Sequence, residues 1–370
     1  FFRSDMRFAS LFVSMPNTFL VLASLSCSAC AYRYSGRDLQ VVTGHHNNRW
    51  CQEHNKLRKT GSTAGEYEDA RDRRPNPSRK LAMLFLAFNS ATRSRSSTPK
   101  MDFPKSGRVV VVTGANKGIG YCIAQQLVEG GMFAHVVLGC RDKERGEKAA
   151  SEVGGEFMQV DLSDSSSIAA FANGIREKYG RLDCLVNNAA IAFKASDPTP
   201  FEGQTSPTLK TNFYGTVELT ESLLPLLRAS EEDPGIVNIA SMAGHLRQLS
   251  SRWQKEFQAE DLTIPRLKRL VAQFEAAVAD GNYRNEGWGS SNYGFSKLAV
   301  IAATKVWARE NEKILVNACC PGYCNTDMSS NRGPRPPAEG ARQAVLLAEL
   351  DFDVMGPTGR FFEDNAESEW

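Results

Sequence analysis

The chain has 370 residues and a formal net charge of +2, with 44 lysines and arginines against 42 aspartates and glutamates. This length exceeds that of a typical single domain. The nearly balanced charge, without a basic stripe interleaved with aromatic residues, argues against a nucleic-acid partner. No metal site is expected, because Cys27 and Cys30 lack two further nearby ligands for zinc.

Residues 1–106 differ in composition from the rest of the chain. An apolar stretch around residues 19–26, followed by Ser-Ala-Cys-Ala, resembles a signal peptide, but Pro16 and Asn17 interrupt it and no stable membrane association is expected. Residues 33–106 are polar and are predicted to be disordered. Because the chain starts with Phe and Met101 precedes the next segment closely, we favour an extension outside the mature protein over a working secretion signal.

A strand, a glycine loop and a helix follow one another in residues 108–128. The β-branched run at 108–113 predicts a buried strand, and an apolar-periodic stretch follows the loop. This context is the one that a dinucleotide site requires, since glycines let the backbone approach a pyrophosphate at a helix N-terminus. The spacing differs from G-x-G-x-x-G, and the alternative is an ordinary turn. The predicted cofactor contacts are Gly114, Asn116, Lys117, Gly118, Ile119 and Gly120.

The strand expected at 135–140 runs into Arg141. In such folds the residue at this position contacts the adenosine ribose of the cofactor. A carboxylate there would accept from the 2′-OH of NAD, whereas an arginine suits a 2′-phosphate. Arg145 one turn later and Lys117 in the loop add positive charge, and Asp142 could pair with either arginine. The alternative is that these arginines belong to a solvated charged turn without a ligand. That interpretation fits Arg145 better than Arg141. NADPH is therefore the predicted cofactor.

Further strands are predicted at 157–162, 182–190, 235–241 and 314–320, with an edge strand at 359–362. Their alternation with helices predicts an α/β fold with a single Rossmann-type, doubly wound parallel sheet of about seven strands over residues 107–370. Asp161 and Leu162 at the third strand are placed to meet the adenine. Asn188 at the end of the fourth lies beside the cofactor. Six cysteines of this region sit mostly on apolar segments, which is typical of a reduced, cytoplasmic protein.

Tyr293 and Lys297 are four residues apart and share one face of a predicted helix. The cation favours phenolate and should lower the tyrosine pKa from about 10. A tyrosine whose pKa is lowered toward neutral pH can pass a proton to a carbonyl oxygen. The pair by itself is equally typical of two exposed helix residues, so its meaning depends on the motifs around it.

About fifty residues separate Ser241 from Tyr293, far more than a strand-to-helix loop needs. Helical spacing predicts an insert at about 245–290, with one helix bounded by Pro265 and Gly281 and a shorter one over 251–259. The apolar positions of the longer helix are Leu267, Leu270, Val271, Phe274 and Val278. The insert is either a surface decoration or a wall over the mouth of the site.

The order and spacing of these landmarks resemble the short-chain dehydrogenases/reductases over about residues 107–370. The resemblance rests on Thr-Gly-Ala-Asn-Lys-Gly-Ile-Gly at 113–120, Asn-Asn-Ala-Ala at 187–190, the Asn212 segment, Ser241 and Tyr293-x-x-x-Lys297. Residues 191–201 and 317–322 and the long gap before Tyr293 resemble the monomeric NADPH-dependent carbonyl reductases. Two positions depart from the family pattern. Ala190 stands where the family usually has glycine, and Tyr323 stands where it usually has tryptophan.

The resemblance implies a role for each matching residue. Tyr293 would be the general acid, Lys297 would lower its pKa and hold the nicotinamide ribose, and Ser241 would bond the substrate carbonyl. Asn212 would bend its helix and hold a water. The reaction would be hydride transfer from NADPH to ketones, aldehydes or quinones. The other implied cofactor contacts are Pro321, Gly322 and Thr326, and the implied contacts to substrate or a glutathione conjugate are Phe193, Lys194, Ala195, Gln204, Ser241 and Tyr323.

The resemblance also implies a monomer, with the insert blocking oligomerisation. Two other functions remain open at this point: an NADPH-binding regulator without turnover, and a reductase for one defined biosynthetic ketone. The expected location is the cytoplasm, with the secretory pathway as the alternative if the apolar N-terminal segment is a real signal.

Overall fold

The computed structural model describes residues 19–23, 30–35, 38–42, 107–350 and 356–370, in two compact units, Phe1–Arg74 and Pro75–Trp370. In the first unit, β1 (Phe19–Ala23), β2 (Cys30–Ser35) and β3 (Asp38–Val42) form an antiparallel sheet in that order. Part of the segment for which we predicted disorder therefore has regular secondary structure. The remaining predictions for residues 1–106 lie outside the described residues.

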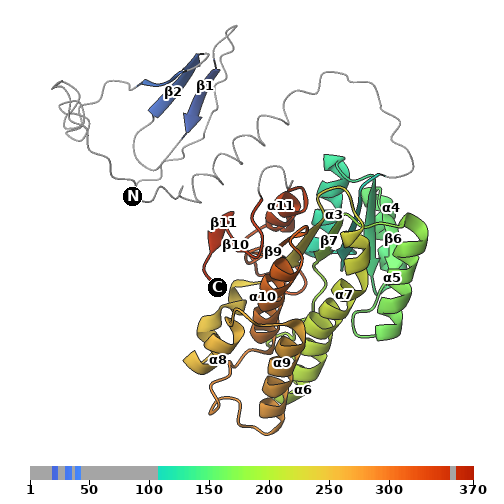
Figure 1. Ribbon diagram of the computed structural model, residues 1–370, viewed down its shortest axis with the longest axis vertical. Coiled ribbons are helices and arrows are strands. Elements are labelled where there is room, and N and C mark those ends of the chain that lie inside the picture. The colour runs from blue at the N-terminus through green and yellow to red at the C-terminus, as the bar shows by residue number, and fades with distance from the viewer. Residues whose placement is uncertain (1–18, 24–29, 36–37, 43–106, 351–355) are drawn as a thin grey trace, which may run out of the picture. The chain divides into compact units, whose positions relative to one another are not determined.

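The second unit contains an eight-stranded sheet, which Figure 1 shows among its helices. The strands are β4 (Val109–Thr113), β5 (His135–Cys140), β6 (Glu156–Gln159), β7 (Cys184–Asn187), β8 (Gly235–Ile239), β9 (Leu315–Cys320), β10 (Phe361–Glu363) and β11 (Ala366–Ser368). Their order is β11-β10-β9-β8-β7-β4-β5-β6, and every pairing except β10–β11 is parallel. The predicted doubly wound sheet is confirmed, with β11 as an additional antiparallel edge strand.

Helices cover both faces of this sheet because its central strands are apolar on both sides. One face packs α3 (Gly118–Gly130), α4 (Lys143–Val153) and α11 (Pro337–Ala348). The other packs α5 (Ser165–Tyr179), α7 (Thr216–Arg228) and α10 (Asn292–Glu310), with α6 (Phe201–Leu209) preceding α7. No helix among the residues that the structure describes is both long and apolar enough to cross a membrane.

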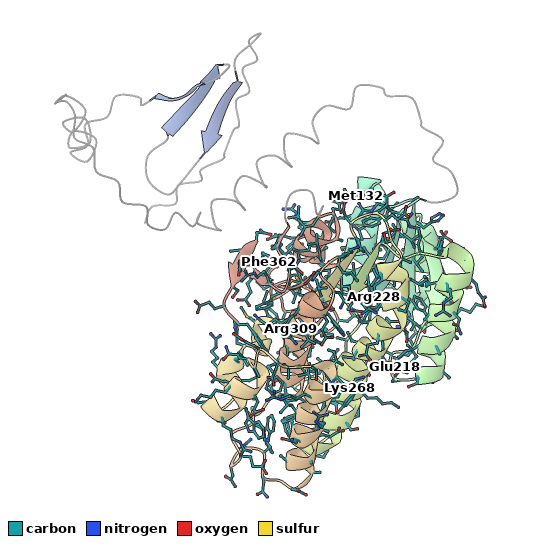
Figure 2. The ribbon with its side chains drawn as sticks, viewed as in Figure 1. Met132, Glu218, Arg228, Lys268, Arg309 and Phe362 are labelled. Atoms are coloured by element: carbon teal, nitrogen blue, oxygen red, sulfur yellow. The ribbon has the colours of Figure 1, made fainter. Side chains whose placement is uncertain are left out.

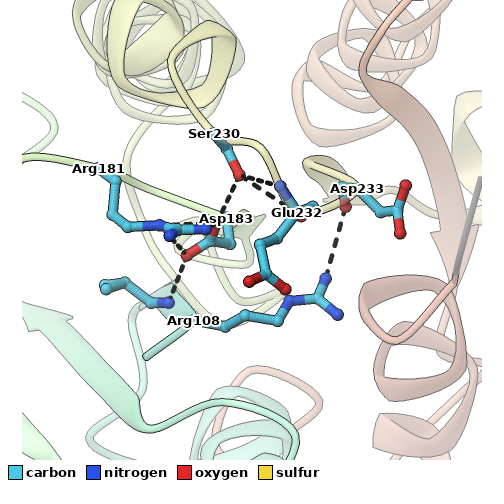
Figure 3. Close-up of polar contacts among 7 residues, drawn as sticks. Arg108, Arg181, Asp183, Ser230, Glu232 and Asp233 are labelled. Carbon is cyan, nitrogen blue, oxygen red and sulfur yellow. Dashed lines mark hydrogen bonds and ion pairs between the residues drawn. The ribbon is translucent and has the colours of Figure 1, made fainter. Parts of the chain in front are cut away.

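A buried carboxylate joins the strands at the amino ends of β4 and β7. Asp183 is fully buried and accepts hydrogen bonds from the backbone N–H of Val109 at 2.7 Å and from Ser230 Oγ at 2.5 Å. Arg181 forms a salt bridge with it at 2.5 Å. Figure 3 shows these groups converging on the Asp183 carboxylate. The network holds the amino ends of β4 and β7 together, at the opposite end of these strands from their carboxyl ends.

The insert is helical, as its spacing predicted, and consists of α8 (Ser251–Phe257) and α9 (Ile264–Ala279). The predicted apolar positions of α9 are all buried, and Phe274 stacks on Phe295 of α10 with ring centroids 3.9 Å apart. Polar contacts add to this packing. Lys268 pairs with Glu221 of α7 at 3.0 Å, and the side chain of Arg309, labelled with Lys268 in Figure 2, donates to the carbonyl of Leu262. The insert therefore packs on α7 and α10 of its own domain.

Candidate active site

A cleft of about 540 Å³ opens at the carboxyl ends of the strands, where the strand order reverses between β4 and β7. Open α/β sheets bind ligands at this kind of switch point. Most of the predicted cofactor contacts line the cleft: Gly114, Asn116, Lys117, Gly118, Ile119, Gly120, Arg141, Arg145, Asp161, Leu162, Asn188 and Thr326. Tyr293, Lys297, Pro321 and Gly322, which were also predicted to contact the cofactor, are not among its lining residues.

The glycine loop has the geometry of a phosphate cradle. Gly114 has a φ of 65°, and a Cβ added there would lie 2.9 Å from Ala189 Cα, while one at Gly120 would lie 2.3 Å from Asn188 Nδ2. Helix α3 begins at Gly118 without a side-chain cap and without an acidic residue in its first turn. Its first N–H groups and the positive end of its dipole therefore suit a phosphate group. These features fit the pyrophosphate of a dinucleotide.

Thr113, which sequence reasoning did not select, fixes the two sides of this cleft to each other. Its hydroxyl accepts from the backbone N–H groups of Asn188 and Ala189, each at 3.0 Å. The side-chain amide of Asn188 donates in return to the carbonyl of Thr113 at 2.8 Å. The end of β4 and the end of β7 are thus joined at the floor of the cleft.

Basic side chains gather where the predicted adenosine end lies. Asp142 caps α4 and pairs with Arg145 at 2.9 Å, which resolves the open choice between the two arginines. Arg141 makes no salt bridge with the residues that the structure describes, so its guanidinium is available to an anion. Lys117 pairs with Asp327 at 2.7 Å, and the hydrogen bond from Lys117 lowers the pKa of the Asp327 carboxyl. Asp327 lines the cleft and is another residue that sequence reasoning missed.

The predicted acid–base residues meet beside this cleft. Ser291 caps α10, which carries both Tyr293 and Lys297. Ser241 follows the end of β8, and its hydroxyl lies near enough to the Tyr293 phenol to act on the pKa of that phenol. Lys297 Nζ lies 5.7 Å from the centroid of the Tyr293 ring and donates to the carbonyl of Ile239 at 2.7 Å. A serine, a tyrosine and a lysine from β8 and α10 are therefore brought together.

Burial controls the pKa values of this group. Desolvation raises the pKa of Tyr293 to about 12, and the Ser241 hydroxyl only partly opposes it. Desolvation lowers the pKa of Lys297 to about 8. The predicted lowering of the Tyr293 pKa by Lys297 is therefore wrong for this structure, because burial dominates and the ammonium is held by Ile239. A phenol that keeps its proton at neutral pH is a suitable acid.

Asn212 lies in a π-helical turn, η1 (Lys210–Gly215), between α6 and α7. Such turns insert an extra residue into a helix and are frequent at functional sites. The side chain of Asn212 accepts from the N–H of Ile191 at 2.8 Å and donates to its carbonyl at 2.9 Å. It also donates to Ser296 Oγ at 3.1 Å. Asn212 thus ties the loop after β7 to α10 beside Tyr293.

The residues predicted to contact substrate or glutathione are more dispersed. Lys194 and Ala195 are exposed and Phe193 is partly buried in the loop after β7. The Gln204 amide donates to the carbonyl of Thr199 at 2.7 Å, so it is engaged locally. Tyr323 is 55% exposed in the loop after β9. None of these residues lines the cofactor cleft, and the glutathione contacts stay a prediction.

The doubly wound sheet, the phosphate cradle and the Ser–Tyr–Lys group define a Rossmann-type oxidoreductase. The chain matches the family described as short chain dehydrogenase over residues 108–251 and 278–336, and the unmatched gap falls on the helical insert. The protein belongs to the short-chain dehydrogenase family.

Named relatives agree with this assignment. The chain is 41% identical over 277 residues to carbonyl reductase (NADPH) 1 of Sus scrofa, and the aligned region covers 71% of this chain and 94% of the relative. The Homo sapiens protein of the same name is 39% identical over 71% of this chain and 98% of its own. Among solved structures, salutaridine reductase from Papaver somniferum has a TM-score of 0.63 at 30% identity, covering 70% of this chain and 99% of that chain. Menthone neomenthol reductase from Mentha piperita has a TM-score of 0.59 at 31% identity, with the same coverage.

Proposed function

We propose that this protein is an NADPH-dependent carbonyl reductase that converts ketones, aldehydes or quinones to alcohols or hydroquinones. The observation that carries the proposal is the grouping of Ser241, Tyr293 and Lys297 beside a dinucleotide cleft, with Lys297 Nζ 5.7 Å from the centroid of the Tyr293 ring. The names of the relatives, which are NADPH carbonyl reductases at about 40% identity, support it. The reaction is a hydride transfer coupled to a proton transfer.

The cleft residues divide the task of holding the cofactor. The N-terminus of α3 and the glycine loop would hold the pyrophosphate, and Arg141 would hold the 2′-phosphate that distinguishes NADPH from NADH. Asp161 and Asn188 also line the cleft. When bound there, the nicotinamide ring supplies the hydride. Everything else in the reaction is binding, orientation and proton transfer by side chains of this chain.

The proton comes from Tyr293. Its phenol donates to the carbonyl oxygen as the hydride reaches the carbonyl carbon, so that the product leaves as an alcohol. The Ser241 hydroxyl donates a hydrogen bond to the same oxygen and stabilises the negative charge that develops on it. Lys297 places a positive charge one turn away from the phenolate that remains. Asn212 keeps the loop after β7 fixed against α10.

The surface beside Ser241 favours apolar carbonyl compounds. Met242 and Tyr323 are exposed by 57% and 55%, and they lie on the two loops that follow β8 and β9. Large apolar side chains exposed together beside a site are typical of a binding surface for an apolar ligand. Aromatic ketones and quinones should therefore be better substrates than sugars of the same size.

The test is NADPH oxidation followed by absorbance, first with menadione and then with a panel of carbonyl compounds. Tyr293→Phe should lower kcat by about 100-fold or more, because general acid catalysis contributes that much, and should leave the Kd for NADPH within about twofold. Tyr179→Phe is the matched control, since Tyr179 ends α5 and stacks obliquely on His135 at the start of β5. Near-wild-type turnover by Tyr293→Phe would refute the mechanism.

The panel also separates the two alternative functions. A regulator that binds NADPH without turnover would show a fluorescence change on NADPH addition but no oxidation with any carbonyl. A reductase for one biosynthetic ketone would reduce neither menadione nor simple aromatic ketones. Turnover of several unrelated apolar carbonyls would contradict both alternatives.

We also propose that Lys194 contacts glutathione conjugates. Its exposed ammonium lies near enough to Asp327 to help lower the pKa of that carboxyl, so a ligand carboxylate could take the place of Asp327. A glutathione-conjugated carbonyl should then turn over faster than its unconjugated counterpart, and Lys194→Ala should remove the difference. Equal rates for the two compounds would reject the proposal.

A monomeric state is proposed from the burial of the insert. The apolar face of α9 is covered by α10 and α6 of the same domain, so it offers no stripe for another subunit. Light scattering at micromolar concentration should give the mass of one chain, and a stable dimer or tetramer would overturn the proposal. The cytoplasmic location also stays a proposal, tested by fractionation of cells that express the full chain.

A further inference from the structure

The side chain of Trp370, the last residue of the sequence, lies on the turn that carries Ser241. Trp370 Nε1 donates a hydrogen bond to the carbonyl of Gly244 at 3.0 Å. The turn itself is η2 (Met242–Gly244), a single 3-10 turn capped by Ser241. The two groups are 126 residues apart in the sequence. The end of the chain therefore reaches the segment that presents the serine hydroxyl to Tyr293.

The indole of Trp370 also closes a small core cluster of its own. This cluster is separate from the two large cores and lies between β9, β10 and α10. Its buried members are Ala240, Ile301, Ala318, Cys320 and Phe361. Ala240 directly precedes Ser241, and Ile301 is one turn beyond Lys297 on α10. Trp370 thus packs between the strand end that carries the serine and the helix that carries the tyrosine and lysine.

A second contact joins the β10–β11 hairpin to the residue after this turn. His245 Nε2 lies 3.3 Å from Glu363 Oε2, and both side chains are mostly buried. Ser368 donates to the same Glu363 oxygen at 2.8 Å. The His245 ring also meets Phe361 edge to face at 5.8 Å. The hairpin therefore holds His245 by a polar contact and by ring packing.

A third contact joins the hairpin to the loop after β9. Asp364 pairs with Arg335 at 2.7 Å. Arg335 in turn donates to the carbonyl of Pro321 at 3.1 Å. The loops that follow β8 and β9 flank the site, and residues 361–370 contact the first directly and the second through Arg335.

The turn has little stability of its own. Its backbone-to-backbone bonds run from Gly244 N to Ser241 O at 2.8 Å and from His245 N to Met242 O at 3.4 Å, and isolated 3-10 turns have poor hydrogen-bond geometry. Side chains add further bonds to the turn, from Gln248 Nε2 to the carbonyl of Ala243 at 2.8 Å and from Met242 N to Cys320 Sγ at 3.3 Å. It is also wedged against α10, since a Cβ at Gly244 would lie 2.9 Å from the backbone N of Leu298. Any movement of Gly244 away from α10 would carry Ser241 with it.

We propose that residues 361–370 are a C-terminal brace that holds Ser241 in register with Tyr293, with Trp370 as its principal positioning residue. The inference rests on the proposed reductase function, because the register matters for proton transfer to a carbonyl oxygen. A misplacement of about 1 Å can cost on the order of 100-fold in rate. No residue of the brace lines the cofactor cleft, so the brace acts on turnover and not on NADPH affinity.

The test compares Trp370→Phe and a chain lacking Trp370 with the full-length protein. Trp370→Phe keeps most of the apolar ring and removes the N–H, while the deletion removes both. Glu367→Gln is the matched control, because it breaks the exposed Arg360–Glu367 ion pair of the same hairpin without touching either loop. The measurements are kcat, KM for a carbonyl, Kd for NADPH, thermal unfolding, and amide hydrogen exchange over residues 241–246.

The expected result is a kcat lowered about tenfold in the deletion and about threefold in Trp370→Phe, with the Kd for NADPH within about twofold. Exchange at residues 241–246 should accelerate, while exchange at residues 184–190 and all properties of Glu367→Gln should not change. A kcat within twofold of wild type in both Trp370 variants, or unchanged exchange, would overturn the brace. A parallel loss of kcat, NADPH affinity and thermal stability would also overturn it, as the sign of a purely structural role.

Failure of the proposed function gives a different pattern. In that case the unmodified protein reduces no carbonyl in the panel, whatever its C-terminus. The exchange measurement, which needs no turnover, then decides by itself whether Trp370 holds the Ser241 turn.

Discussion

Lys297 should make activity and stability respond in opposite directions to alkaline pH. Its side chain is 3% exposed, and its ammonium has one hydrogen bond, to the carbonyl of Ile239 at 2.7 Å, among the residues that the structure describes. Burial in these surroundings disfavours the charged form and lowers the pKa of Lys297 from 10.5 to about 8. The perturbation to apply is therefore a rise in pH from 7 to 10.

The stability effect follows from proton linkage. In the unfolded chain the lysine has a pKa of about 10.4, so between about pH 8 and 10.4 the unfolded state binds a proton that the folded state has released. The free energy of unfolding then rises with pH. This gain in the free energy of unfolding from Lys297 is fully present above about pH 10.5 and is lost as the pH falls to about 8. Its full size is about 3 kcal/mol, since the two pKa values differ by between two and three units.

The activity effect has the opposite sign, because the reaction needs the ammonium. Above about pH 8 the protonated fraction of Lys297 in the free enzyme falls roughly tenfold per pH unit. The pKa of Tyr293 is about 12, so the acid itself stays protonated over this range. The value of kcat/KM for NADPH reports the free enzyme. It should be level to about pH 8 and then fall about tenfold per unit.

The assay combines initial rates between pH 6 and 10 with urea unfolding of the wild type and Lys297→Met. Subtracting the variant from the wild type at each pH removes all other titrating groups. The difference in unfolding free energy should rise by most of the 3 kcal/mol by about pH 10. A kcat/KM for NADPH that stays level from pH 8 to 10, or a difference that does not rise, would refute the assignment of the low pKa to Lys297.

Three further predictions concern the cleft and the sheet. Arg141→Ala should raise the KM for NADPH by about 10-fold or more, the effect of losing a charged hydrogen bond, and leave that for NADH nearly unchanged; equal efficiency of the unmodified enzyme with both cofactors would contradict this. Asp327→Asn should tighten NADPH binding about 2- to 5-fold, because it removes a negative charge that competes with phosphate for Lys117, and unaltered binding in a fluorescence titration would show that the pair does not compete. Asp183→Asn should lower the free energy of unfolding by about 2 kcal/mol, since the buried carboxylate bonds Ser230 and the strand backbone, while kcat at 25 °C stays unchanged; an unaltered urea midpoint would contradict it.

The sequence by itself determined the sheet, the glycine loop and the helix that bears the acid. These features depend on short-range rules: a β-branched run forms a buried strand, as in residues 109–112, and positions four apart share a helix face, as do Tyr293 and Lys297. The spacing of apolar residues in α9 likewise fixed both its helical state and its buried face. Each rule acts within a window of a few residues, so it can be read from the sequence.

The tertiary structure alone decided the charges and the partners. The spacing of Tyr293 and Lys297 predicted a lowered pKa for the tyrosine, but its pKa is raised and that of Lys297 is lowered, because segments distant in the sequence exclude water from both groups. The pairing of Lys117 with Asp327 joins residues 210 apart, and Trp370 meets Gly244 from the far end of the chain. Such contacts depend on how loops are placed by the packed sheet, and no local pattern carries that information. Desolvation in particular is a property of the whole surrounding volume, and it exists only when the chain has folded.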